Sequence, residues 1–229
     1  MNILVIASHP DDEVLGCGGT LARFAREGSS VHIAILGEGL TSRLSSREAA
    51  DPGELKALRA QSQAAGALLG AAEVLHFGLP DNRFDTVPQL EVTKIIEGLV
   101  ERLQPEIVFT QHGGDLNIDH VVTWRATLTA TRPMAGHPVK RVFGYPVGSS
   151  TEWAFQKFSP SFRPTTFFDI EDTLPLKVRA MQAYEGESRP FPHPRSGEAL
   201  EAAARHWGAA AGLRAAEPFE LVREIIRAP

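Results

Sequence analysis

The chain has 229 residues, of which 43% are hydrophobic and 22% are charged, and its net charge is −5. This length and composition predict one globular domain with a large core. The negative charge argues against nucleic acid or an anionic membrane as partner, because no basic surplus is available to neutralise phosphates. Cys17 is the single cysteine, so no internal disulfide can form. Because a signal sequence and a membrane span are also not recognisable, we expect a cytoplasmic protein without membrane insertion.

Short apolar segments alternate with helical patterns along the first 145 residues. The expected strands are 2–8, 31–36, 73–77, 107–110 and 140–145, and the expected helices are 13–27, 46–69, 87–103 and 120–131. This alternation predicts an α/β fold in which a mostly parallel sheet has helices on both faces.

The last third of the chain has weaker signals. The segment 146–164 is rich in Ser, Pro and aromatic residues and is either a substrate loop or a long connection. Helices are expected at 174–184 and 196–211, and a strand or helix at 219–226. We therefore divide the single domain 1–229 into an α/β core, 1–145, and a C-terminal part, 146–229, that completes a substrate pocket.

Three carboxylates follow the first expected strand in the segment Ser8-His-Pro-Asp-Asp-Glu13. Ligands of open α/β sheets bind just beyond the carboxyl ends of the strands, and this segment lies at such an end. A divalent cation would allow Asp11 and Asp12 to stay ionised side by side, and imidazole with carboxylate suits zinc, iron or manganese. Without thiolates, such a site is expected to be catalytic. The alternative is that the acidic residues only cap the next helix, but the added His9-Pro10 favours a metal.

A second polar segment follows the expected strand 107–110 and reads Gln111-His-Gly-Gly-Asp-Leu-Asn-Ile-Asp-His120. A catalytic zinc binds about three protein ligands and keeps an open position for water. His9 and Asp12 supply two ligands. If the strand 107–110 lies beside the first strand, this segment reaches the same edge of the sheet and supplies the third.

Two histidines of the second segment are candidates for that third ligand. We choose His120, because it opens a helix and its position is therefore rigid, and His112 is the second choice. The alternative interpretation is a polar loop whose following helix is capped by Asp119. Four other histidines share no strand-end cluster with carboxylates, and we expect them to pack or to lie on the surface: His32, His76, His137 and His206.

The two segments resemble the signature motifs of the PIG-L/LmbE-like family of zinc-dependent N-deacetylases. The first matches the family pattern (A/S)HPDDE in full, and the second has the form H-x-x-D-x-N-x-D-H of many bacterial members. Further similarity lies in GLPDNRFD (78–85), SSTEW (149–153) and HPRSGEAL (193–200), so the resemblance spans nearly the whole chain. The last two segments are similar to a bacterial branch associated with sugar and cell-surface or secondary-metabolite biosynthesis.

The resemblance implies a Rossmann-like α/β fold and removal of the acetyl group from an N-acetylated amino sugar, or its conjugate, of GlcNAc type. It implies that His9, Asp12 and His120 bind the metal, with zinc as the expected ion and iron or manganese as substitutes. It also implies that Asp11 is the general base and that the protein is a homo-oligomer.

In the expected mechanism, Asp11 takes a proton from a metal-activated water and passes it to the leaving amine. A second donor would stabilise the oxyanion, an effect of about 3 kcal/mol for one good donor. Several members of the family have a histidine three residues before the terminal histidine of the second motif, where this chain has Asn117. Asn117, His112 and His193 are therefore the candidates for this role.

Polar side chains in the later loops are expected to bind the sugar hydroxyls. The candidates after the second and third strands are Arg43, Asp81 and Arg83, and Arg195 follows His193. Arg43 also suits a phosphate if the substrate is a nucleotide sugar or a phosphosugar. For each arginine, the alternative is a surface or structural ion pair.

Other functions fit parts of the same pattern. The segment GCGGT (16–20) would be the glycine cue of a nucleotide-binding Rossmann protein, but it is not G-x-G-x-x-G and falls inside an expected helix. Leu36 and Gly37 stand where such a protein would have an acidic ribose ligand. A non-catalytic sugar-binding protein would not need Asp11 beside the ligands. An amidase acting on a non-sugar or thiol-conjugate amide would use the same site residues.

Overall fold

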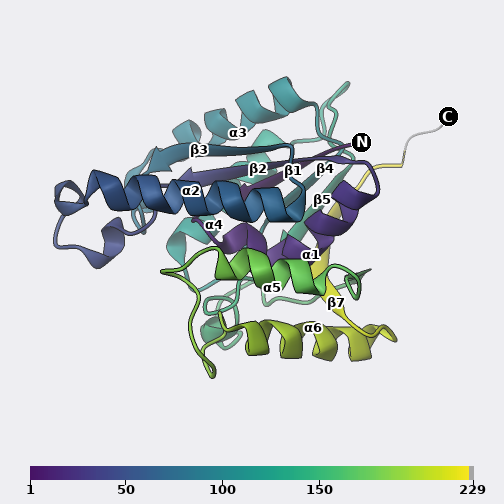
Figure 1. Cartoon of the computed structure of the whole chain (residues 1–229). Coiled ribbons are helices and arrows are strands. Elements are labelled where there is room, and N and C mark those ends of the chain that lie inside the picture. Colours follow the sequence, from purple (N-terminus) through teal and green to yellow (C-terminus); the bar gives the residue numbers. More distant parts are fainter. Residues whose placement is uncertain (227–229) are drawn as a thin grey trace.

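A seven-stranded sheet forms the centre of the computed structural model, which describes residues 1–226 (Figure 1). The strand order is β3-β2-β1-β4-β5-β7-β6. The strands are β1 (Asn2–Ala7), β2 (Ser30–Gly37), β3 (Glu73–Leu79), β4 (Ile107–Gln111), β5 (Arg141–Tyr145), β6 (Thr166–Asp169) and β7 (Ala216–Glu224). The first five are parallel, whereas β7 is antiparallel to both β5 and β6. The predicted mostly parallel α/β sheet is confirmed.

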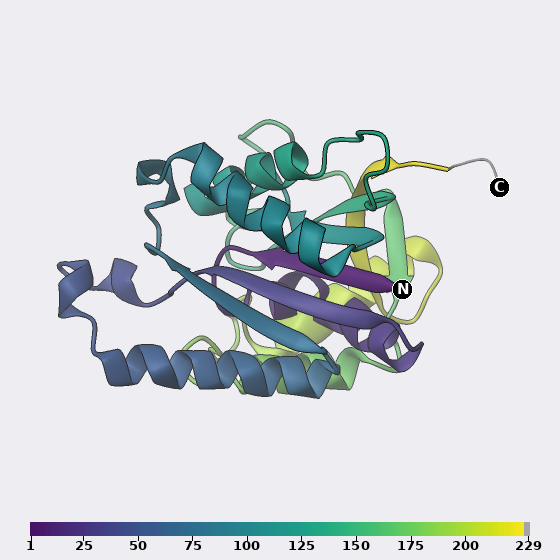
Figure 2. The same cartoon turned by 90° about the horizontal axis from the view of Figure 1, so that it is seen from above.

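Helices cover both faces of this sheet, as Figures 1 and 2 show. Within residues 1–226 they are α1 (Asp12–Arg26), α2 (Pro52–Leu69), α3 (Gln89–Leu103), α4 (Ile118–Ala130), α5 (Leu174–Gln182) and α6 (Gly197–Ala211). Helices α3 and α4 pack on one face, and α1, α2 and α5 pack on the other. Helix α6 packs against α5 and β7. No helix within residues 1–226 has the length and apolar character needed to cross a membrane.

The strand β1 supplies side chains to two separate cores. Ile3 and Val5 pack on the face of α1 and α2, whereas Leu4 and Ile6 pack on the face of α3 and α4. Because side chains alternate between the two faces of a strand, a strand buried on both faces needs apolar residues at every position. This requirement explains the uninterrupted apolar run that ends at Ser8.

The glycines of the segment GCGGT allow α1 to approach its neighbours closely. A Cβ atom at Gly16 would lie 2.1 Å from the ring of Tyr145, and one at Gly19 would lie 2.9 Å from Ile170. Both positions lie inside α1, as predicted. Close packing therefore accounts for these two glycines without a bound nucleotide.

The helix expected at 46–69 begins later than predicted, at Pro52. Its N-cap is Asp51, whose side chain accepts a hydrogen bond from the backbone N–H of Gly53, and proline is favoured in the first turn that follows. Two short 3-10 turns, Thr41–Arg43 and Arg47–Ala49, occupy the preceding loop.

The helix expected at 120–131 begins earlier, at Ile118. Its N-cap is Asn117, whose side chain accepts a hydrogen bond from the backbone N–H of Asp119. The alternative interpretation, in which Asp119 caps this helix, is therefore wrong, because the amide two residues earlier fills that position and leaves the Asp119 carboxylate available for other contacts.

The C-terminal third completes the sheet. The segment expected at 219–226 as a strand or helix is the strand β7, which begins at Ala216 and lies between β5 and β6. The strand β6 was not predicted, because four residues are too few for an alternating pattern to be visible. Residues 227–229 of the predicted C-terminal part lie outside the described residues.

Candidate metal centre

The loops that follow β1 and β4 meet at the carboxyl edge of the sheet. β1 and β4 are neighbouring parallel strands. This neighbourhood is the condition under which the second polar segment could supply the third ligand. The first loop carries His9 and leads to Asp12 at the start of α1, and the second leads to His120 in the first turn of α4. One ligand atom from each of His9, Asp12 and His120 lies within 4.8 Å of the others. The topology thus brings together the three residues expected to bind a metal.

Asp12 is almost fully buried at the centre of this group. Its Oδ2 accepts hydrogen bonds from the backbone N–H of His9 at 2.8 Å and from the side chain of Gln111 at 2.9 Å. The same oxygen lies 3.3 Å from Nε2 of His120 and 3.5 Å from Nδ1 of His9. Burial acts to raise the pKa of Asp12, but His120 and His9 outweigh burial and hold it well below its ordinary value. Asp12 is therefore an ionised carboxylate facing two imidazoles.

His120 gives the clearest sign that these residues suit a metal. Both of its ring nitrogens are buried and neither makes a hydrogen bond, although buried polar atoms normally do. Burial acts to lower the pKa of His120, but the carboxylates of Asp12 and Asp115 outweigh burial and raise it to about 9. The protonated imidazole then supplies a positive charge between two carboxylates. A divalent cation would supply positive charge at the same place and take a ring nitrogen of His120 as a ligand.

Further carboxylates hold the two imidazoles in place. Oδ2 of Asp119 lies 2.9 Å from Nε2 of His9, and Asp81 lies 3.4 Å from the same nitrogen. Asp115 lies 3.2 Å from Nδ1 of His120. His9, Asp81 and Asp119 are themselves close enough to hold an ion, but both carboxylates also accept backbone N–H groups. We interpret them as orienting His9, which is how carboxylates commonly act behind metal-binding histidines.

Asp11 lies beside this group but has a different partner. Its Oδ2 accepts a hydrogen bond from Nη1 of Arg195 at 2.8 Å, and the side chain is 2% exposed. Burial raises the pKa of Asp11 well above its ordinary value, against the opposing effect of Arg195. Its φ of 101° lies in the left-handed region, which costs a non-glycine residue about 1–3 kcal/mol. Strain of this kind concentrates at functional sites.

A chain of ion pairs joins Asp11 to the arginines predicted to bind substrate. Nη1 of Arg195 also donates to Glu187 at 2.6 Å, and its Nε donates to Ser149 at 2.8 Å. Arg43 donates to both oxygens of Glu187, at 2.7 and 2.6 Å. Both arginines thus make the structural ion pairs that were the alternative interpretation. Glu187 was missed in the sequence, because no motif marks it.

Two of the three residues predicted to stabilise an oxyanion already have partners. His112 is fully buried, with Nδ1 2.8 Å from Glu220 and Nε2 2.8 Å from the carbonyl oxygen of Pro160. Asn117 caps α4 with its oxygen and donates to Asn82 with its Nδ2. Neither His112 nor Asn117 belongs to the group that could hold an ion.

His193 is the third candidate and the least engaged. Its Nδ1 accepts a hydrogen bond from the backbone N–H of Arg195, so Nε2 carries the ring hydrogen. Within residues 1–226, Nε2 makes no hydrogen bond. Trp153 packs edge-on against the ring, with centroids 5.7 Å apart. Burial, together with Arg195 and Arg189, lowers the pKa of His193, so the ring is a neutral hydrogen-bond donor at neutral pH.

The other two predicted substrate residues lie on the loop after β3. Asp81 is buried, and one of its oxygens accepts a hydrogen bond from the backbone N–H of Ser42. Arg83 is exposed. Their roles in substrate binding stay predictions.

A comparison with known proteins identifies the family. Residues 4–131, more than half of the chain, match the family model described as PIG-L: GlcNAc-PI de-N-acetylase. This chain belongs to the PIG-L family. The predicted resemblance is thereby confirmed.

Individual relatives of this PIG-L protein differ in the reactions for which they are named. The uncharacterized deacetylase YaiS of Escherichia coli is 26% identical over 194 residues, which cover 80% of this chain and 90% of YaiS. The 4-oxalmesaconate hydratase of Pseudomonas putida is 28% identical over 196 residues, which cover 80% of this chain and 73% of the hydratase. The solved structure of the conserved protein TT1542 from Thermus thermophilus is 30% identical, with 99% of this chain and 97% of that chain covered and a TM-score of 0.75.

Proposed function

We propose that this protein is a metal-dependent hydrolase that removes the acetyl group from an N-acetylated amino sugar of GlcNAc type, or from a conjugate of such a sugar. The observation that carries the proposal is the buried His120, whose Nε2 makes no hydrogen bond and lies 3.3 Å from the ionised Asp12 beside His9. The name of the matching family model, a de-N-acetylase of GlcNAc, supports the choice of reaction.

His9, Asp12 and His120 are the residues we assign to the metal. Two imidazoles and one carboxylate without thiolates suit a catalytic zinc, and iron or manganese suit the same donors. A zinc bound there lowers the pKa of water to about 7 and polarises an amide carbonyl. Asp119 and Asp115 fix the orientation of the two imidazoles from behind.

Asp11 is the residue we assign as general base. Because Arg195 occupies its Oδ2, Oδ1 is the oxygen that takes the proton from water and later passes it to the leaving nitrogen. The deprotonated water forms a bond to the acetyl carbonyl carbon, the C–N bond then breaks as the nitrogen takes the proton, and the products are acetate and the free amine. Arg195 is a positioning residue in this scheme, because it fixes the Asp11 carboxylate and opposes the effect of burial on its pKa.

His193 is the residue we favour for stabilising the negative charge that develops on the amide oxygen. Its Nε2–H is the donor that has no partner within residues 1–226, whereas both nitrogens of His112 and the amide of Asn117 are engaged. A donor placed at the developing charge contributes on the order of 3 kcal/mol to catalysis in other hydrolases.

A second candidate function is hydration of a carbon–carbon double bond, which the identity to a hydratase favours. The same general base would activate water for addition instead of hydrolysis. Hydrolysis of a non-sugar or thiol-conjugate amide is a third candidate that uses the same residues.

We also propose that the protein is a homo-oligomer in the cytoplasm. The single buried Cys17 suits a reducing compartment.

The test is metal analysis of the purified protein combined with assays of both reactions. We expect about one divalent ion per chain and release of acetate from GlcNAc, from its glycosides or from a nucleotide sugar. A chelator should stop this release, and zinc should restore it. A metal-loaded protein that releases no acetate from any of these compounds would contradict the proposal, and hydration of 4-oxalmesaconate by the same sample would establish the second candidate.

A further inference from the structure

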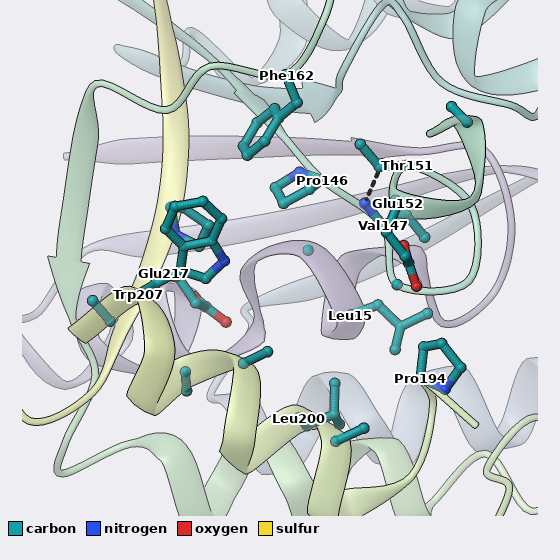
Figure 3. A pocket seen from close by; sticks show the side chains of 18 of the residues that line it. Leu15, Pro146, Val147, Thr151, Glu152, Phe162, Pro194, Leu200, Trp207 and Glu217 are labelled. Atoms are coloured by element: carbon teal, nitrogen blue, oxygen red, sulfur yellow. Dashed lines mark hydrogen bonds between the residues drawn. The ribbon is translucent and has the colours of Figure 1, made fainter. Parts of the chain in front are cut away.

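A pocket of about 680 Å³ lies beside the proposed metal centre (Figure 3). Its walls come from the start of α1, from the loop after β5, from α6 and from the start of β7. Figure 3 shows Trp207 and Phe162 toward one side of this pocket, and Pro194 and Glu152 toward the other. The volume is in the range that encloses a drug-sized ligand, so the pocket has room for a substantial organic group.

One wall of the pocket is formed by α1, the helix that begins at the proposed site residues. Leu15 and Gly16 line the pocket, and each follows a site residue, Asp11 or Asp12, by four positions. Residues four apart lie on the same side of a helix, one turn or about 5.4 Å along its axis. This wall of the pocket therefore begins about one helical turn from Asp12.

Three further segments connect the pocket with the proposed metal centre. Gly114 and Thr151 line the pocket; Gly114 precedes Asp115 in the chain, and the hydroxyl of Thr151 donates to Asp115 at 2.6 Å. Pro194, also in the wall, precedes Arg195, which contacts the general base. Together with the start of α1, four separate parts of the chain thus contribute both to the pocket and to the proposed metal centre or its neighbours.

The pocket has no unpaired cation among its described lining residues. Among the described lining residues, the charged ones are Lys177, Glu217 and Glu152. Lys177 and Glu217 are buried and pair at 2.6 Å, and Glu217 also accepts two backbone N–H groups. Glu152 accepts the backbone N–H of Ser149. Because Lys177 is the one cation among the described lining residues and is already paired with Glu217, the pocket does not suit a polyanion such as a nucleoside diphosphate.

The face of α6 that lines the pocket is apolar and mostly small. Its residues are Ala199, Leu200, Ala203, Ala204 and Trp207, a spacing that places them along one side of the helix. The alanines leave space that larger side chains would fill, and Leu200 and Trp207 provide apolar contact surface. An apolar ligand group would therefore leave water here at little desolvation cost to the protein.

We infer that this pocket binds an apolar aglycone, so that the preferred substrate is an N-acetylated amino sugar linked to an alkyl or aryl group. The inference rests on the proposed function. If the group removed is acetyl, it is too small to fill this pocket, so the aglycone is the part of the substrate that can fill it. Each methylene that leaves water upon binding should improve kcat/KM by up to about fourfold.

The experiment compares acetate release from the methyl, butyl and hexyl glycosides of GlcNAc in both anomeric forms. In the metal-loaded protein, kcat/KM should rise by about tenfold or more from methyl to hexyl. The variant Ala203→Glu places a carboxylate in the pocket and should reduce the hexyl-to-methyl ratio toward one. Ala202→Glu is the matched control, because Ala202 is a neighbouring exposed residue of α6 that does not line the pocket, and it should keep the ratio.

Calorimetric titration with hexyl glucoside, which has no acetyl group, separates the pocket from the reaction. Binding with a negative heat-capacity change is expected, because apolar surface is buried, and Ala203→Glu should abolish it. If acetate release did not depend on alkyl chain length, or if the two alanine variants changed the hexyl-to-methyl ratio equally, the aglycone site would be wrong. The proposed deacetylase activity would be unaffected by that result. If hexyl glucoside bound but no glycoside released acetate, the proposed deacetylase activity would be wrong and the apolar ligand site would be retained.

Discussion

The metal centre and the apolar pocket adjoin each other but are built in different ways. The proposed metal centre is the group of His9, Asp12 and His120, which lie where β1 and β4 end side by side. The pocket is assembled mainly from the loop after β5, from α6 and from the start of β7. The family match ends at residue 131, so it covers the residues assigned to the metal but little of the pocket. Family membership therefore supports the reaction, whereas the substrate has to be inferred from packing in the C-terminal part.

Removal of a proposed metal ligand should have the largest effect. His120→Ala should lose the bound metal and reduce acetate release by at least about 100-fold, because the metal contributes several kcal/mol to the reaction. Metal content and turnover are measured on the same sample. His32→Ala serves as the control, since His32 pairs at 3.5 Å with the partly exposed Glu73 away from the group. Full metal content in His120→Ala would remove His120 from the ligand set.

On the pocket side, the largest expected effect is on stability. Lys177→Met removes one partner of a buried ion pair and leaves Glu217 without its cation, which should lower the free energy of unfolding by about 3–5 kcal/mol. Lys94→Met breaks an exposed pair with Glu97 and should cost about 0–1 kcal/mol. Urea unfolding measures both variants. Equal losses in the two would show that water reaches the Lys177 pair and that this wall is not a fixed part of the pocket.

A smaller effect is expected from the carboxylate behind His9. Asp119→Asn should weaken metal affinity by about 10- to 100-fold, because the charge that orients His9 is lost while the ligands remain. Competition with a chelator of known affinity measures this change. Asp85→Asn, at an exposed position on the loop after β3, should leave the affinity as it is. An unchanged affinity in Asp119→Asn would show that His9 needs no such support.

The sequence was informative where function depends on the ends of buried strands. His9, Asp11 and Asp12 follow a strand that is apolar at every position, and the end of such a strand predicts a ligand site. The position of His120 needed one further assumption, that β1 and β4 are neighbours, and the sheet order satisfies it. Local patterns thus predicted the residues that meet at the metal centre, because the parallel sheet fixes where they meet.

Contacts between distant segments could not be predicted in this way. Glu187 joins Arg43 to Arg195 from a loop without any motif, and the sequence gives no sign of this pairing. Asp119 and Asn117 are equally good helix caps by residue type, and only the structure shows that Asn117 is the one used. The apolar pocket could not be predicted either, because its walls depend on how α6 packs against the rest of the fold.

The most direct test of the central claim is the variant Asp11→Asn, measured for metal content and for acetate release together. The division of roles predicts that the metal stays bound by His9, Asp12 and His120 while kcat falls by about 10²- to 10⁴-fold, the usual contribution of a general base. Arg195 keeps its ion pair with Glu187 in this variant, so its position is retained. Wild-type turnover with metal bound would contradict the assignment of Asp11 as base, and loss of the metal would place Asp11 among the ligands.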